Sequence, residues 1–65
     1  MTPRFDRAEF QKLFGRRLAA CRLAKNLSQL QFAETTGYHS QTISNLERGL
    51  TCPSLFAVFL FAEVL

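Results

Sequence analysis

The sequence has few of the residues from which catalytic, cofactor and metal sites are built. Its 65 residues include one histidine, five acidic residues and three glycines. It contains no glycine-rich phosphate loop, and its histidine, cysteine and acidic residues do not have metal-ligand spacing. These absences argue against an enzyme, and we expect no cofactor and no bound metal.

Cysteine is also scarce. Cys21 and Cys52 stand far apart in unlike sequence contexts. A disulfide framework normally contains more cysteines, and zinc ligands have a different spacing. Because free cysteine is often buried, we expect Cys21 to be a small core residue.

The sequence has no long hydrophobic segment. Residues 1–11 are polar and charged, unlike a signal peptide. The apolar run at residues 55–65 has 11 positions, whereas a membrane-spanning helix needs about 20. We therefore expect a cytoplasmic protein that does not enter a membrane.

The composition indicates one small folded domain. A hydrophobic content of 48% favours folding over disorder. No repeat, low-complexity tract or linker divides residues 1–65, and residues 1–5 are expected to form a short N-terminal arm. A chain of this length buries only about 60% of the surface that its unfolded form exposes.

Positive charge is concentrated in the N-terminal half. The net charge is +3, and seven of the eight lysines and arginines lie between Arg4 and Lys25. A local basic excess favours a polyanionic partner, but charge alone does not distinguish nucleic acid from a membrane surface.

The first helix is expected over residues 7–25. Asp6 can cap it with Glu9 as capping-box partner, and Phe5 and Phe10 have the spacing of a hydrophobic staple. Asn26 suits the left-handed conformation that ends a helix. Helical periodicity places the following residues on one broad apolar face: Phe10, Leu13, Phe14, Leu18, Cys21 and Ala24. The opposite, solvent-facing side carries Lys12, Arg16 and Ala19.

A second helix is expected over residues 29–36. Ser28 and Gln31 have the spacing of a capping box, and Gly37 can adopt the left-handed conformation that ends a helix. Gln29 lies in the first turn beside unpaired backbone N–H groups, where an anion such as phosphate binds well. The alternative is that Gln29 is an ordinary first-turn residue.

A third helix is expected from residue 39 or 40 to residue 48. Ile43 and Leu46 point to the core. The opposite face is polar, with Ser40, Gln41, Ser44, Asn45 and Arg48. Glutamine and asparagine match the donor and acceptor of adenine, and arginine matches guanine or phosphate. Two interpretations stay open at this point: a base-reading surface, or a solvated face, which usually carries more lysine and glutamate.

A fourth helix is expected from Pro53 to the end, because proline is favoured in a first turn. After Ser54 only Glu63 is polar, so this helix is apolar nearly all round. Such a helix should be buried on more than one side.

These features together resemble a known family. Residues 14–65 are similar to the helix-turn-helix domain of phage repressors, Cro proteins and their bacterial relatives, the XRE type. The resemblance lies in the following segments: LSQLQFA at 27–33, Gly37, TISNLERG at 42–49, FGRRL at 14–18, Arg22, and Pro53 to Leu55. It implies an all-α fold, a small four-helix bundle (or a truncated five-helix bundle) with the helix-turn-helix at about 28–48.

The resemblance also implies roles for particular residues. Gln29 corresponds to a glutamine that contacts phosphate. Arg22 and Glu47 correspond to a partly buried ion pair that ties the first helix to the third, and Arg22 can also approach a phosphate. The positions that reach base edges or adjacent phosphates are His39, Ser40, Gln41, Ser44 and Asn45. His39 stands where the family usually has serine or threonine as N-cap, so we expect capping to shift to Ser40.

In the fourth helix the resemblance divides the apolar residues into two groups. The inward face is expected to be Leu55, Val58, Ala62 and Leu65. The surface left for a partner is expected to be Phe56, Leu60, Phe61 and Val64. Either a second copy of the chain or residues missing from a fragment would cover that surface, and we favour the homodimer.

The resulting functional expectation is a sequence-specific, double-stranded-DNA-binding transcriptional regulator. Its recognition helix at about 39–48 would enter the major groove, and a dimer would bind a twofold-symmetric operator. The alternative is an antitoxin-type or other protein-interaction module that uses the apolar C-terminal helix.

Overall fold

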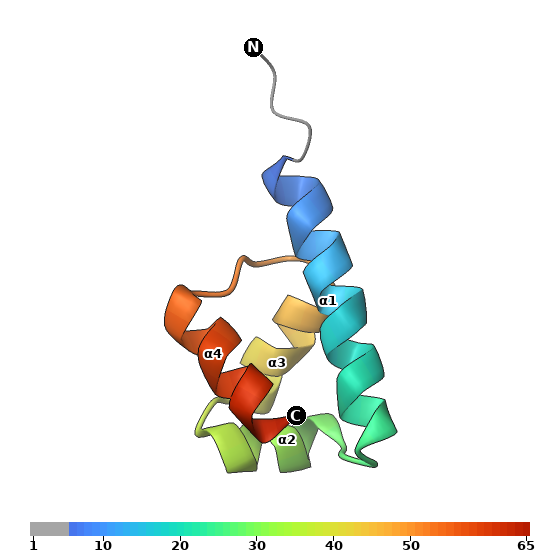
Figure 1. Cartoon of the computed structure of the whole chain (residues 1–65), viewed down its shortest axis with the longest axis vertical. Coiled ribbons are helices and arrows are strands. Elements are labelled where there is room, and N and C mark those ends of the chain that lie inside the picture. The colour runs from blue at the N-terminus through green and yellow to red at the C-terminus, as the bar shows by residue number, and fades with distance from the viewer. Residues whose placement is uncertain (1–5) are drawn as a thin grey trace.

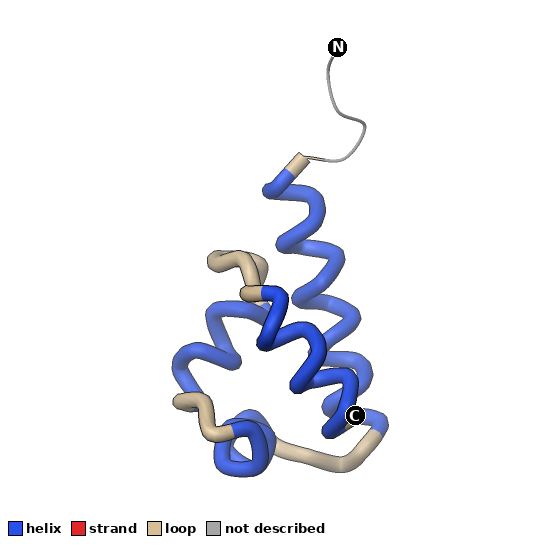
Figure 2. The backbone as a smooth tube through the Cα atoms, turned by 60° about the vertical axis from the view of Figure 1, so that its left-hand side comes forward, coloured by secondary structure: helices blue, strands red, loops and turns tan. Residues whose placement is uncertain are grey.

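In the computed structural model, residues 6–65 are described, and they form four α-helices and no strand (Figures 1 and 2). The helices are α1 Arg7–Ala24, α2 Gln29–Thr36, α3 Ser40–Glu47 and α4 Leu55–Val64. The all-α prediction is therefore confirmed. Residues 1–5, with the expected arm and Phe5 of the staple, lie outside the described residues.

Local sequence signals set the ends of the first two helices. The Asp6 side chain accepts a hydrogen bond from the Glu9 backbone N–H at 2.8 Å. At α2, Ser28 Oγ accepts from the Gln31 N–H at 3.0 Å, and the Gln31 side chain accepts in return from the Ser28 N–H at 2.8 Å. The predicted capping box of α2 is thus confirmed, and it satisfies two of the N–H groups that a helix start leaves unpaired.

Left-handed backbone ends α2 and follows α1 as predicted. Gly37 has φ 81° and Asn26 has φ 59°. At the start of α3, however, His39 occupies the N-cap position and its side chain makes no capping hydrogen bond. The expected shift of capping to Ser40 is wrong, since Ser40 is already the first residue of the helix.

Helix α4 begins two residues later than predicted, and its inward side also differs from the predicted one. Ser54 is its N-cap and accepts from the Ala57 N–H at 3.1 Å, so Pro53 precedes the helix. Phe61 is only 3% exposed, which corrects its assignment to an open partner surface. Conversely, Leu55, which was expected to point inward, is 74% exposed.

The core lies where α3 packs on α1 and where α2 packs on both α3 and α4. Its fully buried side chains are Phe32 and Ile43. The Phe61 ring packs against Phe32 and Tyr38, with ring centroids 5.1 Å and 5.5 Å apart. The buried core cluster is Leu18, Phe32, Ala33, Ile43, Leu46, Ala57 and Phe61.

The buried side of α1 is rotated from the apolar face predicted for it. Its buried residues are Gly15, Leu18 and Arg22, while Cys21 is exposed and free. The prediction of Cys21 as a core residue is therefore wrong. Hydrophobic periodicity failed here because α1 packs most extensively on α3, and the close approach occurs at a glycine rather than at an apolar side chain.

At that contact the α3 backbone lies directly against Gly15. A Cβ atom on residue 15 would lie 2.5 Å from the carbonyl oxygens of both Leu46 and Glu47. These are backbone atoms at the end of α3, so they cannot move aside without shifting the helix.

We predict that Gly15→Ala destabilises the protein by about 1–3 kcal/mol, because an added methylene group strains a tightly packed contact. In an open helix interior the same change would stabilise by about 0.5–1 kcal/mol. Denaturant unfolding measures the sign, with exposed Ala20→Gly as a reference for helix propensity. A stabilised Gly15→Ala variant would contradict the close contact.

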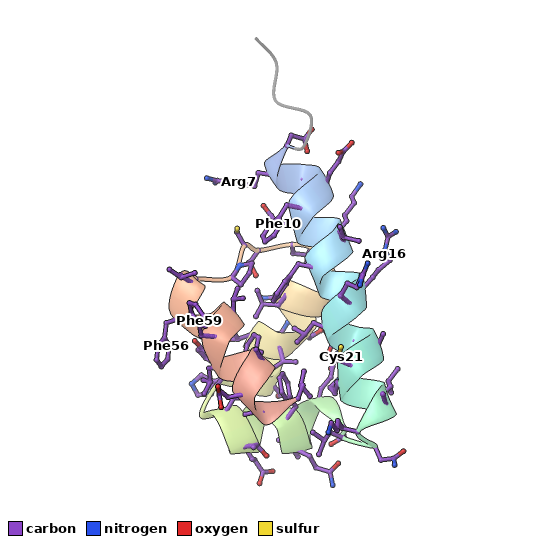
Figure 3. All side chains as sticks on the ribbon, viewed as in Figure 1. Arg7, Phe10, Arg16, Cys21, Phe56 and Phe59 are labelled. Carbon is purple, nitrogen blue, oxygen red and sulfur yellow. The ribbon has the colours of Figure 1, made fainter. Side chains whose placement is uncertain are left out.

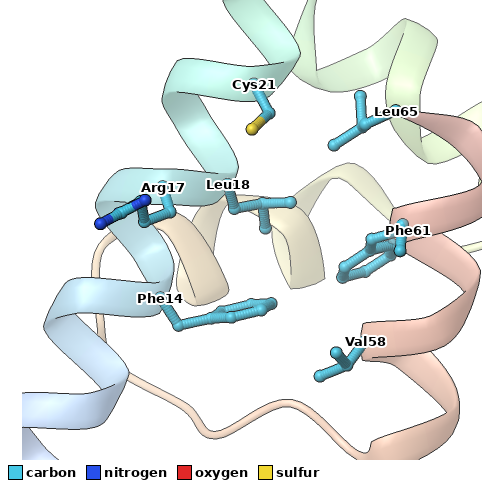
Figure 4. Close-up of a pocket in the computed structure, with 8 residues that line it drawn as sticks. Phe14, Arg17, Leu18, Cys21, Val58, Phe61 and Leu65 are labelled. Carbon is cyan, nitrogen blue, oxygen red and sulfur yellow. The ribbon is translucent and has the colours of Figure 1, made fainter.

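Between α1 and α4 lies an apolar groove of about 310 Å³ (Figure 4). Phe14 and Leu18 from α1 face Val58 and Phe61 from α4 across it, while the Arg17 guanidinium is turned away.

Among residues 6–65, no helix has the length and apolar character needed to cross a membrane.

Candidate nucleic-acid interface

Helix α3 follows α2 after the turn at Gly37. It has one buried side and one accessible side. Ile43 and Leu46 are buried against the core. On the other side, Ser40, Gln41 and Arg48 are exposed, and the half-buried side chains are Ser44 and Asn45. The polar residues predicted for this face therefore lie on one accessible surface, which we call the α3 polar face. His39 is exposed immediately before it.

Two amide side chains on the α3 polar face are hydrogen-bonded to each other. Gln41 Nε2 donates to Asn45 Oδ1 at 3.0 Å. The residues are four positions apart, the spacing at which helical side chains are neighbours. The bond leaves the Gln41 Oε1 acceptor and the Asn45 amide donors available to a ligand.

A buried ion pair fixes α3 against α1. Arg22 Nε donates to Glu47 Oε2 at 2.6 Å, and its NH2 group donates to Glu47 Oε1 at 3.1 Å. The two side chains are 10% and 7% exposed. This bidentate geometry sets both the position and the rotation of the C-terminal end of α3.

Two further hydrogen bonds extend this pair to α2. The NH1 group of Arg22 donates to the Leu27 carbonyl oxygen at 2.7 Å. Gln29 Nε2 donates to Glu47 Oε1 at 3.0 Å. The residues Arg22, Gln29 and Glu47, which we call the brace, thus connect α1, the start of α2 and the end of α3.

The electrostatics of the brace favour a charged Arg22. The hydrogen bond from Arg22 to Glu47 raises the pKa of Arg22 above its already high ordinary value, outweighing the opposing effect of burial. The guanidinium of Arg22 therefore stays charged at every pH at which the protein would be handled.

Gln29 combines a structural bond with the position expected of a phosphate ligand. It is half-buried in the first turn of α2, where backbone N–H groups point out of the helix. Its amide nitrogen carries a second hydrogen besides the one given to Glu47. An oxyanion at this helix end would meet the second hydrogen of the Gln29 amide, the backbone N–H groups of the first turn and the positive end of the helix dipole.

Sequence reasoning missed two contacts that position α3. One is the close approach of α1 to α3 at Gly15. A sequence signal for it was available, because glycine inside a helix is unfavourable by itself and therefore indicates a packing reason. The other is Gln11 Nε2, which donates to the Gly49 carbonyl oxygen at 3.2 Å and holds the chain just after α3. No sequence signal identified that partner, because the two residues are 38 positions apart.

The fold and the α3 polar face together define an all-α protein with a helix-turn-helix. A helix-turn-helix family model matches residues 18–65, well over half of the chain. The chain belongs to this family, the XRE type, whose members are DNA-binding regulators. No curated protein matched the sequence.

Proposed function

We propose that this protein is a sequence-specific, double-stranded-DNA-binding transcriptional regulator that inserts α3 into the major groove. The observation that carries the proposal is the α3 polar face. It is accessible, rich in hydroxyl and amide groups, and held at a fixed angle by the brace. Such short side chains let a helix approach base edges closely, and their donors and acceptors match those of bases.

Phosphate contacts would supply the register on the duplex. The N-terminus of α2 with Gln29 is the best-formed anion site for this purpose, and exposed Arg48 lies at the end of the α3 polar face. Contacts of this kind position a protein on DNA without reading its sequence.

Random-site selection on double-stranded DNA tests the proposal directly. We expect enrichment of a twofold-symmetric sequence whose half-sites are about 34 Å apart, one helical turn. Binding of the selected duplex should weaken steeply as salt rises, because phosphate neutralisation releases counterions. Failure to enrich any sequence would contradict sequence-specific recognition.

We predict that Gln41→Ala weakens binding to the selected operator by about 5- to 150-fold, the value of one good bidentate base contact. Binding to a scrambled duplex should change little, because the residue makes no phosphate contact in this scheme. Fluorescence anisotropy on both duplexes measures the difference. Equal losses on the two DNAs would refute base reading by Gln41.

A homodimer through α4 would account for the twofold operator. Phe56 and Phe59 are 70% and 65% exposed, and Phe56 extends from the side of α4 that faces away from α1 (Figure 3). Leu55 adjoins them and Leu60 is half-buried, whereas Val64, which was expected on this surface, packs against the core. An apolar patch of this kind marks an interaction surface.

We predict that Phe56→Glu with Phe59→Glu produces a monomer, because burying two carboxylates in an apolar contact is strongly unfavourable. Sedimentation at micromolar concentration should show a dimer for the original chain and a monomer for the variant. Operator affinity should fall with the loss of one half-site contact. A monomeric original chain would contradict the dimer.

The same apolar surface of α4 favours one alternative, an antitoxin-type or other protein-interaction module. In that case α4 would bind a different protein, with or without DNA. A salt-dependent affinity for duplex DNA favours the regulator, and its absence favours the module.

A further inference from the structure

The hydrogen bond between Gln41 and Asn45 indicates that these side chains act together. They lie on the accessible face of α3, and the bond of 3.0 Å runs from Gln41 Nε2 to Asn45 Oδ1. A free glutamine side chain samples many rotamers, whereas this bond restricts the Gln41 amide to orientations that keep its nitrogen toward Asn45.

The bond also decides what each amide can still offer. Gln41 keeps one N–H and its Oε1 acceptor, which form the donor–acceptor edge that matches N7 and N6 of adenine. The Asn45 oxygen is turned toward Gln41, while both hydrogens of its NH₂ group are free, so Asn45 presents itself to a ligand mainly as a donor. A group that presents donors suits guanine, which shows two acceptors (N7 and O6) in the major groove, or O4 of thymine, better than adenine, whose N7 acceptor stands beside the N6 donor.

The helix geometry places the two contacts close together on DNA. Four residues of α-helix rise about 6 Å, and successive base pairs are about 3.4 Å apart. The two amides therefore reach neighbouring or next-but-one base pairs of one half-site.

We infer that Gln41 and Asn45 read DNA as one hydrogen-bonded unit, in which Asn45 orients Gln41 toward adenine and itself selects guanine or thymine nearby. This inference rests on the proposed function and deepens it. It makes Asn45 a positioning residue for the contact of Gln41 as well as a reader of its own base pair.

Random-site selection with five proteins tests the inference: the original chain, Gln41→Ala, Asn45→Ala, Asn45→Asp and Glu34→Ala. The Gln41→Ala variant identifies the base pair that Gln41 reads. At that base pair, Asn45→Ala should reduce the preference for adenine by about 5-fold or more, within the range of one base contact. Glu34→Ala, an exposed change on α2 outside the α3 polar face, should leave it unchanged.

Asn45→Asp separates orientation from general damage. Its Oδ1 still accepts from Gln41, so the preference for adenine should persist. Its own donors are gone, so the preference for guanine or thymine at the second base pair should disappear. Overall affinity should fall because the carboxylate repels phosphate, but the comparison uses base preference and not affinity.

The failures are distinguishable. If the original chain enriches no sequence, the proposed function fails and the inference fails with it. If it enriches a site but Asn45→Ala leaves the adenine preference at the Gln41 position intact, the inference alone is overturned. Circular dichroism confirms that each variant is folded.

Discussion

Replacing Glu47 by alanine should destabilise the protein by about 3–5 kcal/mol, the usual cost of leaving one charge of a buried pair without its partner. The Arg22 side chain is only 10% exposed, and it would lose both of its bonds to the carboxylate. Gln29 would lose its bond to Glu47 as well. Denaturant unfolding measures the loss, which is large against the roughly 3–10 kcal/mol expected for a domain of this size.

Two matched variants separate the buried charge from other effects. Exposed Glu34→Ala should change the free energy of unfolding by less than about 0.5 kcal/mol. Arg22→Met combined with Glu47→Leu should recover most of the loss, since apolar residues of similar volume often replace a buried pair without cost. A loss for Glu47→Ala no larger than for Glu34→Ala would show that the brace contributes nothing.

The direction of the Arg22 pKa shift determines at which pH the stabilising effect of its charge is lost. The pKa of Arg22 is raised in the folded protein, so its stabilising effect is fully present below the ordinary arginine pKa and is lost only above it. Stability contributed by the Arg22 charge should therefore be constant between mildly acidic and mildly basic pH.

The helix-turn-helix was predictable because its signals are local. Ser28 and Gln31 are three residues apart, and Gly37 supplies the left-handed end of α2 by its own conformational freedom. The inward residues of α3, Ile43 and Leu46, follow from helical periodicity alone. Nothing distant is needed to place these residues, and the structure confirms each of them.

The inward sides of α1 and α4 were not predictable in the same way. Both helices carry more apolar positions than one face can hold, so periodicity does not determine which face is buried. For α1 the answer depends on the fit of Gly15 against the end of α3. For α4 it depends on the packing of the Phe61 ring against Phe32 and Tyr38.

The brace was likewise predictable only in part. The resemblance implied the Arg22–Glu47 pair, but the bond from Gln29 to Glu47 depends on how α2 and α3 lie against each other. Gln29, expected to contact phosphate or to be an ordinary first-turn residue, is thereby joined to the residues that orient α3. In the proposed complex with DNA, a phosphate contact at Gln29 would therefore be connected through Glu47 to the angle of α3.

The second large effect is expected at Phe61, which was predicted to lie on an open partner surface but is buried in the structure. Phe61→Ala should destabilise the protein by about 3–5 kcal/mol, since it removes a buried ring and leaves a cavity. The ring is 3% exposed and packs against Phe32 and Tyr38. Denaturant unfolding measures the loss.

Phe56→Ala is the matched control, because the same side chain is removed from the same helix at a position that is 70% exposed. In the monomer it should change the free energy of unfolding by less than about 0.5 kcal/mol. If α4 forms a dimer, Phe56→Ala should cost stability only at high protein concentration, because association stabilises by mass action. The loss for Phe61→Ala should persist at every concentration. A loss for Phe61→Ala that vanished on dilution would instead place Phe61 in the partner surface.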